Sequence, residues 1–322
     1  MLYHIGYHKT ATTWLQVNLF SNADLGFVPF GSLIPHTGEP PSKKDVSKVG
    51  AKYFIRHDDF RILLPFETRK EEFLGTCKSS QSSEKTTVIS NERLSGHPSS
   101  GGYDAFLIAS RIVDADPSAK IVICFRNQVN MITSYYFQYL KGGGRKSIKE
   151  LLSETFDPRR IGFSLDHFAY DKLAQYYIEH LGSKNVLLLP YEELLETPNV
   201  FVNNIMMFAG HSYNMDQDFA RFDRANAPSH SLRYSRMLAR HLCPDARSRE
   251  ARDFSAALRA NKFMYGATLH GLNAILSERY AKNQIHKIKR RVRHDIEKYF
   301  CESNVRLEGL CGKSLREKYG YP

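Results

Sequence analysis

The sequence of 322 residues has no apolar run long enough to cross a membrane. Because an apolar, strand-like run begins at once, we also expect no signal peptide, and at most a peripheral contact with a membrane. The five cysteines are odd in number and form no C-x-x-C pair, which predicts neither a disulfide framework nor a zinc site. No internal repeat or linker is evident. These absences predict one domain over residues 1–322 in the reducing cytoplasm.

Acidic residues are outnumbered by basic ones, 34 to 45, which gives a formal net charge of +11. This excess favours an anionic partner, such as a charged cofactor, an acidic glycan or a nucleic acid. Basic residues concentrate at 285–293, within a segment at 275–300 whose apolar spacing is helical, and we interpret it as an amphipathic helix with a solvated basic face. No basic platform interleaved with aromatics is present, so we expect no nucleic-acid partner. The oligomeric state is left open.

Strand-like and helix-like segments alternate along most of the chain. Continuous apolar runs are typical of buried parallel strands, and helical periodicity marks the segments between them. The expected strands are 2–5, 86–90, 120–125 and 186–189. The expected helices are 14–20, 104–116, 129–140, 167–181 and 199–208. This order predicts an α/β fold of three layers, with a central, mainly parallel sheet flanked by helices and a helical C-terminal elaboration.

The first turn of the chain gathers residues suited to binding an anion. A turn between a strand and a helix aims backbone N–H groups and the positive end of the helix dipole at one point. Here the turn adds a full positive charge and three hydroxyl groups, and it predicts a site for a phosphate-like group. The turn residues are His8, Lys9, Thr10, Ala11, Thr12 and Thr13. The usual ATP-binding loop has glycine before its lysine, where this chain has histidine.

Two further residues follow strand ends. Glu92 comes just after the strand at 86–90, which places it at the carboxyl ends of the strands, where ligands of open α/β sheets bind. Arg126 follows the strand at 120–125, and its guanidinium can grip a phosphate through two N–H bonds. Ser134 stands eight positions later on the following helix. A basic glycine loop at 141–146 is interpreted either as a flap over the substrate or as a connector.

The residues 7–14 resemble the 5′-phosphosulfate-binding loop of sulfotransferases, the enzymes that use 3′-phosphoadenosine 5′-phosphosulfate (PAPS). Arg126 and Ser134 have the spacing of the pair that holds the 3′-phosphate of PAPS in that family. The turn at 191–194 is similar to the family's Tyr-Glu-Asp-Leu turn. Residues 302–307 and 319–322 resemble the end of bacterial, carbohydrate-type members.

The resemblance implies a P-loop-like fold, PAPS as co-substrate without a metal, and an acceptor hydroxyl on a carbohydrate or glycolipid. Lys9 would stabilise the charge on the leaving oxygen, and the loop residues from His8 to Thr13 would hold the donor. Glu92 would be the catalytic base, with His97 as the runner-up. Arg233 is one candidate, in the segment 224–240, for closing over the donor.

Three alternatives stay open. The first is a divergent P-loop kinase, which would need ATP, Mg²⁺ and a carboxylate to order the metal. The second is a non-enzymatic protein that binds polyanions, which would show a steep dependence on salt. The third is a former sulfotransferase fold that is used only for binding, although intact Lys9, Arg126 and Ser134 count against it. For the acceptor, a small molecule in place of a carbohydrate is compatible with the same site.

Overall fold

A computed structural model describes residues 1–30, 51–55, 66–80, 85–141, 143–153, 162–212 and 278–322. The chain divides into two compact units, which are considered separately. The first comprises Met1–Asn127, Asp157–Phe222 and Phe300–Tyr321, and the second comprises Gln128–Phe156, Asp223–Tyr299 and Pro322. The single domain expected from the sequence stays a prediction.

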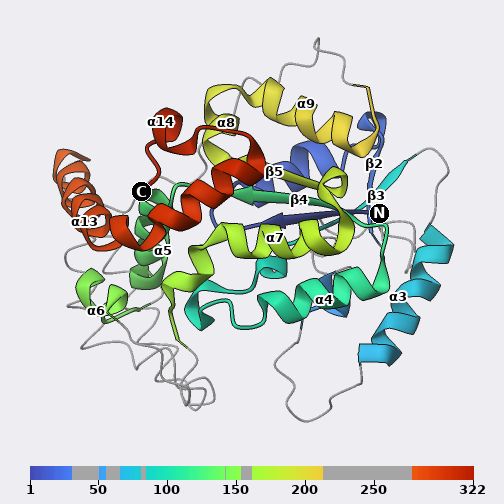
Figure 1. Cartoon of the computed structure of the whole chain (residues 1–322), viewed down its shortest axis with the longest axis horizontal. Helices are drawn as coiled ribbons and strands as arrows, with labels where there is room; N and C mark the ends of the chain where they lie inside the picture. The colour runs from blue at the N-terminus through green and yellow to red at the C-terminus, as the bar shows by residue number, and fades with distance from the viewer. Residues whose placement is uncertain (31–50, 56–65, 81–84, 142, 154–161, 213–277) are drawn as a thin grey trace. The chain divides into compact units, whose positions relative to one another are not determined.

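The first unit contains a five-stranded sheet in the order β2-β3-β1-β4-β5, and all of its neighbouring strands are parallel (Figure 1). The strands are β1 (Leu2–Gly6), β2 (Phe27–Pro29), β3 (Thr86–Ser90), β4 (Lys120–Phe125) and β5 (Val186–Pro190). In the central register, Tyr3 lies opposite both Ile89 and Ile121. Because β1 is flanked by β3 and β4, the direction of winding reverses at β1. Ligands of open parallel sheets bind at the carboxyl ends of strands beside such a reversal.

Helices cover both faces of this sheet, as the sequence predicts for an α/β fold (Figure 1). On one face, Val122 and Cys124 pack in a buried cluster with Leu19 and Phe201. This face carries α1 (Thr12–Leu15), the π-helix η1 (Gln16–Phe20), α8 (Tyr191–Glu196) and α9 (Pro198–Ala209). The opposite face carries α4 (Ala105–Ala115) and α7 (Tyr170–Leu181). The alternation of β4 side chains between two covered faces explains why the strand is apolar throughout.

Several elements differ from the sequence-based boundaries. The helix expected at 167–181 is divided into η6 (Leu165–Phe168) and α7, because Ala169 leaves the helical conformation. The final helices are α13 (Glu278–Cys311) and α14 (Leu315–Tyr319), so the basic helix continues well beyond its expected end. The remaining elements are η2 (Ala23–Leu25), η3 (Ala51–Tyr53), α3 (Phe66–Ser80), η4 (Glu92–Ser95), η5 (Pro98–Ser100) and η7 (Ser183–Asn185). None of the described helices combines the length and the apolar character that crossing a bilayer requires.

The second unit contains α5 (Gln128–Lys141), α6 (Ile148–Leu152) and the first part of α13. The hydroxyl of Tyr139 on α5 accepts hydrogen bonds of 3.0 Å from the backbone N–H groups of both Arg145 and Lys146. A Cβ atom on Gly144 would lie 2.3 Å from the ring of Tyr139. The described part of the glycine loop is therefore fastened to α5, which favours the connector interpretation over the flap.

Candidate active site

The loop between β1 and α1 has an unusual backbone. Lys9 and Ala11 both adopt the left-handed conformation, with φ of 65° and 62°. Residues other than glycine rarely do so, and each such conformation costs on the order of 1–3 kcal/mol. Left-handed residues alternating with right-handed ones turn successive N–H groups toward one side and form a concave anion site. The conformation therefore suits the binding of a phosphate or sulfate group.

Short contacts hold this loop against the sheet. The N–H of Tyr7 donates to the carbonyl of Cys124 at 2.9 Å, and the Thr10 hydroxyl donates to the carbonyl of Tyr7 at 2.6 Å. The loop also folds back over Gly6, where an added Cβ would lie only 2.3 Å from Thr12 Oγ1. Glycine is needed at position 6 because the loop passes so close to it. The Thr10 hydrogen is already used inside the loop, so Thr10 would serve an anion through its backbone N–H.

Three buried polar atoms around the loop have no hydrogen-bond partner among the described residues: His8 Nδ1, Thr12 Oγ1 and Arg126 Nε. Buried polar groups in folded proteins are nearly always paired, so such a group of orphans is typical of a ligand site. Arg126 reaches the loop directly, because its Nη1 donates to the carbonyl of Lys9 at 3.2 Å. Its guanidinium also lies 4.8 Å from the ring centre of Tyr191, the first residue of α8. The residues present thus fit an anionic group at this place.

Glu92 begins η4, directly after the end of β3, and its carboxylate approaches the same loop. Glu92 Oε1 lies 3.8 Å from His8 Nε2. Burial lowers the pKa of His8 to about 2, with further lowering by His97 and other neighbours, so His8 is neutral and the contact is not an ion pair. Although 48% of its side chain is exposed, desolvation by surrounding protein raises the pKa of Glu92, while Lys9 and Arg93 oppose that rise. Glu92 is therefore a carboxylate with increased basicity.

His97 lies edge-on to His8, with 4.7 Å between the ring centres. Its Nδ1 accepts a hydrogen bond of 3.1 Å from the N–H of Ser99. Burial lowers the pKa of His97 as well, so we assign the neutral tautomer with the proton on Nε2. In that tautomer His97 presents a donor, not a free lone pair, on its remaining nitrogen.

A third histidine, which the sequence did not reveal, belongs to this neighbourhood. The ring of His167, from η6, lies 5.2 Å from the ring of Tyr7. Burial, with smaller effects of His97 and Arg93, lowers its pKa to about 3, and its Nε2 has no hydrogen-bond partner among the described residues. Arg93, one of these neighbours, pairs with Asp104 at 3.0 Å. Nothing in the local sequence around His167 distinguishes it from a core histidine.

The structure brings together most of the residues that the sequence singled out. His8, Lys9 and Thr12 follow β1, Glu92 and His97 follow β3, and Arg126 follows β4, all at the carboxyl ends of the central strands. Thr13 is exposed on the first turn of α1. Ser134 is half-buried on α5 of the second unit, and Arg233 lies outside the described residues. The functions of all these residues stay predictions.

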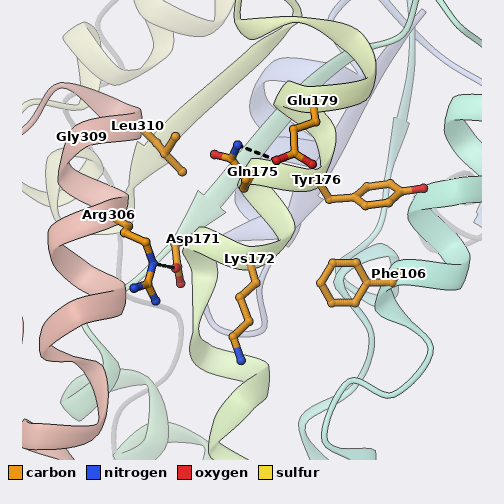
Figure 2. Close-up of a pocket in the computed structure, with 9 residues that line it drawn as sticks. All are labelled: Phe106, Asp171, Lys172, Gln175, Tyr176, Glu179, Arg306, Gly309 and Leu310. Carbon is orange, nitrogen blue, oxygen red and sulfur yellow. Dashed lines mark hydrogen bonds and ion pairs between the residues drawn. The ribbon is translucent and has the colours of Figure 1, made fainter.

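A separate pocket of about 540 Å³ lies between α4, α7 and the end of α13 (Figure 2). Its charged side chains are engaged with neighbours. Arg306 pairs with Asp171 at 2.7 Å, and Gln175 donates to Glu179 at 2.8 Å. Since these groups are already satisfied, this pocket does not offer the unpaired donors that the β1–α1 loop offers. Within the described residues, no group of three or more His, Cys, Asp or Glu side chains is arranged to hold a metal ion.

Residues 4–224, more than half of the chain, match the sequence profile of the sulfotransferase domain. The chain belongs to the sulfotransferase family. Two solved structures are similar to this sulfotransferase. A sulfotransferase from Alicyclobacillus acidocaldarius is 19% identical, with a TM-score of 0.45 over 81% of this chain and 95% of that chain. The sulfotransferase domain from the curacin biosynthetic pathway is 11% identical, with a TM-score of 0.41 over 84% of this chain and 97% of that chain. No curated protein matches the sequence.

Proposed function

We propose that this sulfotransferase moves a sulfuryl group from PAPS to a hydroxyl group of a carbohydrate or glycolipid. The family supports the class of reaction. The observation that carries the choice of donor is the left-handed loop around Lys9, with unpaired buried atoms on His8, Thr12 and Arg126 beside it. A donor with two separate phosphate groups would satisfy both the loop and the arginine.

Different residues would bind the two phosphate groups of the donor. The backbone N–H groups of the loop and the hydroxyl of Thr12 would hold the 5′-phosphosulfate, in a site concave toward an anion. Arg126 would hold the 3′-phosphate, since a guanidinium can bind phosphate through two parallel N–H bonds. The resemblance assigns Ser134 to the same phosphate.

The chemistry is an in-line transfer. The acceptor oxygen forms a bond to sulfur while the bond from sulfur to the phosphate oxygen breaks, and adenosine 3′,5′-bisphosphate leaves. Lys9, which belongs to the loop itself, would stabilise the negative charge that develops on the departing oxygen. The hydroxyl proton of the acceptor passes to Glu92, which balances the reaction.

The hydrogen bonding of the two candidate bases favours Glu92. Its carboxylate is accessible and its pKa is raised by desolvation, which makes it a better proton acceptor near neutral pH. The Nδ1 lone pair of His97 is occupied by the N–H of Ser99. His97 would then donate a hydrogen bond, and we propose that it orients the acceptor. A glutamate base also agrees with the carbohydrate-type resemblance, which supports the proposed acceptor class.

Calorimetry with adenosine 3′,5′-bisphosphate tests this proposal. We expect binding that does not change when Mg²⁺ is removed with a chelator, and that is lost when 5′-AMP, which lacks the 3′-phosphate, is used in its place. Binding that requires Mg²⁺, or equal binding of 5′-AMP, would contradict PAPS as the donor. A panel of glycans and small phenols incubated with radiolabelled PAPS then tests the acceptor class.

A further inference from the structure

Arg126 and Asn127 form the two-residue turn that follows β4. Contacts from several elements of the first unit hold this turn in place. The carbonyl of Arg126 accepts a hydrogen bond of 2.8 Å from the hydroxyl of Tyr170 on α7. The guanidinium of Arg126 lies over the ring of Tyr191. The backbone N–H of Asn127 donates to Glu192 Oε1 at 3.2 Å. The backbone next to the proposed phosphate-binding arginine is therefore fixed by a carboxylate.

The segment 319–321, remote in sequence, completes this arrangement. The side-chain amide of Asn127 donates to the carbonyls of Tyr319 and Gly320 at 3.1 and 2.8 Å. The hydroxyl of Tyr321 donates to Glu192 Oε2 at 3.0 Å. One oxygen of Glu192 thus holds the turn after β4, and the other is held by Tyr321.

Tyr321 is well placed to fix the position of Glu192. Its side chain is 1% exposed, and its ring lies edge-on to Phe125, the last residue of β4, at 6.2 Å. A buried tyrosine with a single hydroxyl contact loses little packing when it is changed to phenylalanine. Loss of that hydroxyl would remove one hydrogen bond from a part-buried, charged carboxylate. The carboxylate would then be held by fewer hydrogen bonds, and it would fix the turn that carries Arg126 less firmly.

We propose that Tyr321 is a positioning residue for donor binding, which acts through Glu192 and Asn127 on Arg126. This inference rests on the proposed function, because it takes Arg126 as a ligand of the donor's 3′-phosphate. It assigns to the segment 319–321 a role in the affinity for PAPS, although that segment lies about two hundred residues from Arg126 in the sequence.

The first test measures the KM for PAPS and the KM for the acceptor separately in Tyr321→Phe. Loss of one hydrogen bond to a charged group predicts a rise of about tenfold in the KM for PAPS. The KM for the acceptor and kcat should stay within about twofold, because the change reaches only the phosphate-binding turn. Tyr177→Phe is the matched control, since Tyr177 is also fully buried and its hydroxyl has no partner among the described residues. The control should leave both KM values unchanged.

A double-mutant cycle shows whether Tyr321 acts through Arg126. In an Arg126→Ala background, Tyr321→Phe should raise the dissociation constant of adenosine 3′,5′-bisphosphate by less than about twofold, because the residue on which it acts is gone. If the dissociation constant of the double variant rises by the product of the two single-variant factors, the substitutions act independently and the inference is overturned. A general loss of stability in Tyr321→Phe with equal changes in both KM values would also overturn it. Glu192→Gln provides a second variant, which should resemble Tyr321→Phe in its selectivity for the donor.

The outcomes separate this inference from the proposed function. If wild-type protein does not bind adenosine 3′,5′-bisphosphate, the proposed function fails and the inference fails with it. If wild type binds and Arg126→Ala weakens binding, but Tyr321→Phe binds as wild type does, only the role of Tyr321 is refuted.

Discussion

The substitution Glu92→Gln is the most informative change in the proposed acceptor site. Glutamine has nearly the same size as glutamate, so the side chain would stay near His8 Nε2, which lies 3.8 Å from Glu92 Oε1. The substitution removes the proton-accepting carboxylate. A general base contributes about 10²–10⁴ to a rate, so we expect kcat to fall about a thousandfold. Binding of adenosine 3′,5′-bisphosphate should change little, because Glu92 serves the acceptor.

The pH dependence provides a second measure of the same residue. A base must be deprotonated to act, so activity is present above the pKa of Glu92 and is lost as the pH falls through it. Because desolvation raises that pKa, the acid limb of kcat/KM should lie above the ordinary glutamate pKa of about 4.3. His8 does not produce this limb, because burial lowers its pKa to about 2.

The assay is the transfer of label from radiolabelled PAPS to an accepted glycan, with His97→Gln as the comparison. His97→Gln removes a donor to the acceptor and should cost about tenfold, mostly in the KM for the acceptor. Near-normal turnover by Glu92→Gln would remove Glu92 from the mechanism. A thousandfold loss of kcat in His97→Gln alone would transfer the role of base to the histidine.

Three further predictions concern the donor site and the loop. Arg126→Ala should weaken adenosine 3′,5′-bisphosphate binding by about 3 kcal/mol, roughly a hundredfold, with a smaller effect on kcat, as measured by calorimetry and steady-state kinetics. Gly6→Ala should lower the free energy of unfolding by about 1–3 kcal/mol in urea titrations, because its Cβ would meet Thr12 Oγ1 at 2.3 Å. Gly75 lies on α3, and a Cβ added there would meet no atom of another part of the described structure within 4 Å, so Gly75→Ala should leave stability equal or raise it by about 0.5–1 kcal/mol. Equal losses in both alanine variants would contradict the packing argument.

Four of the five strands could be predicted from the sequence, because they are continuous apolar runs, whereas the three-residue edge strand β2 was not predicted. The runs at 86–90 and 120–125 match β3 and β4 residue for residue. The family and the reaction class were also predicted, from the loop around Lys9. The left-handed backbone at Lys9 and Ala11 was not predicted, because residues other than glycine seldom adopt it and no sequence pattern indicates it.

Contacts between segments that are distant along the chain could not be predicted from the sequence. His167 reaches the candidate site through η6, and its neighbours Tyr7 and His97 come from other parts of the chain. Tyr321 meets Glu192 across 129 positions. Such pairs depend on how helices pack on the sheet, which local periodicity does not encode. The division at Ala169 was missed for a related reason, since an apolar period continues across it.

The central claim is that Lys9 catalyses sulfuryl transfer from PAPS, and single-turnover transfer of label by Lys9→Ala tests it most directly. Both proteins are loaded with radiolabelled PAPS at saturating concentration, so that weaker binding does not limit the variant. The account predicts transfer by the wild type and a rate lower by about 10²–10³ in the variant, because the charge on the departing oxygen has lost its preorganised cation. Transfer by Lys9→Ala at the wild-type rate would contradict the account.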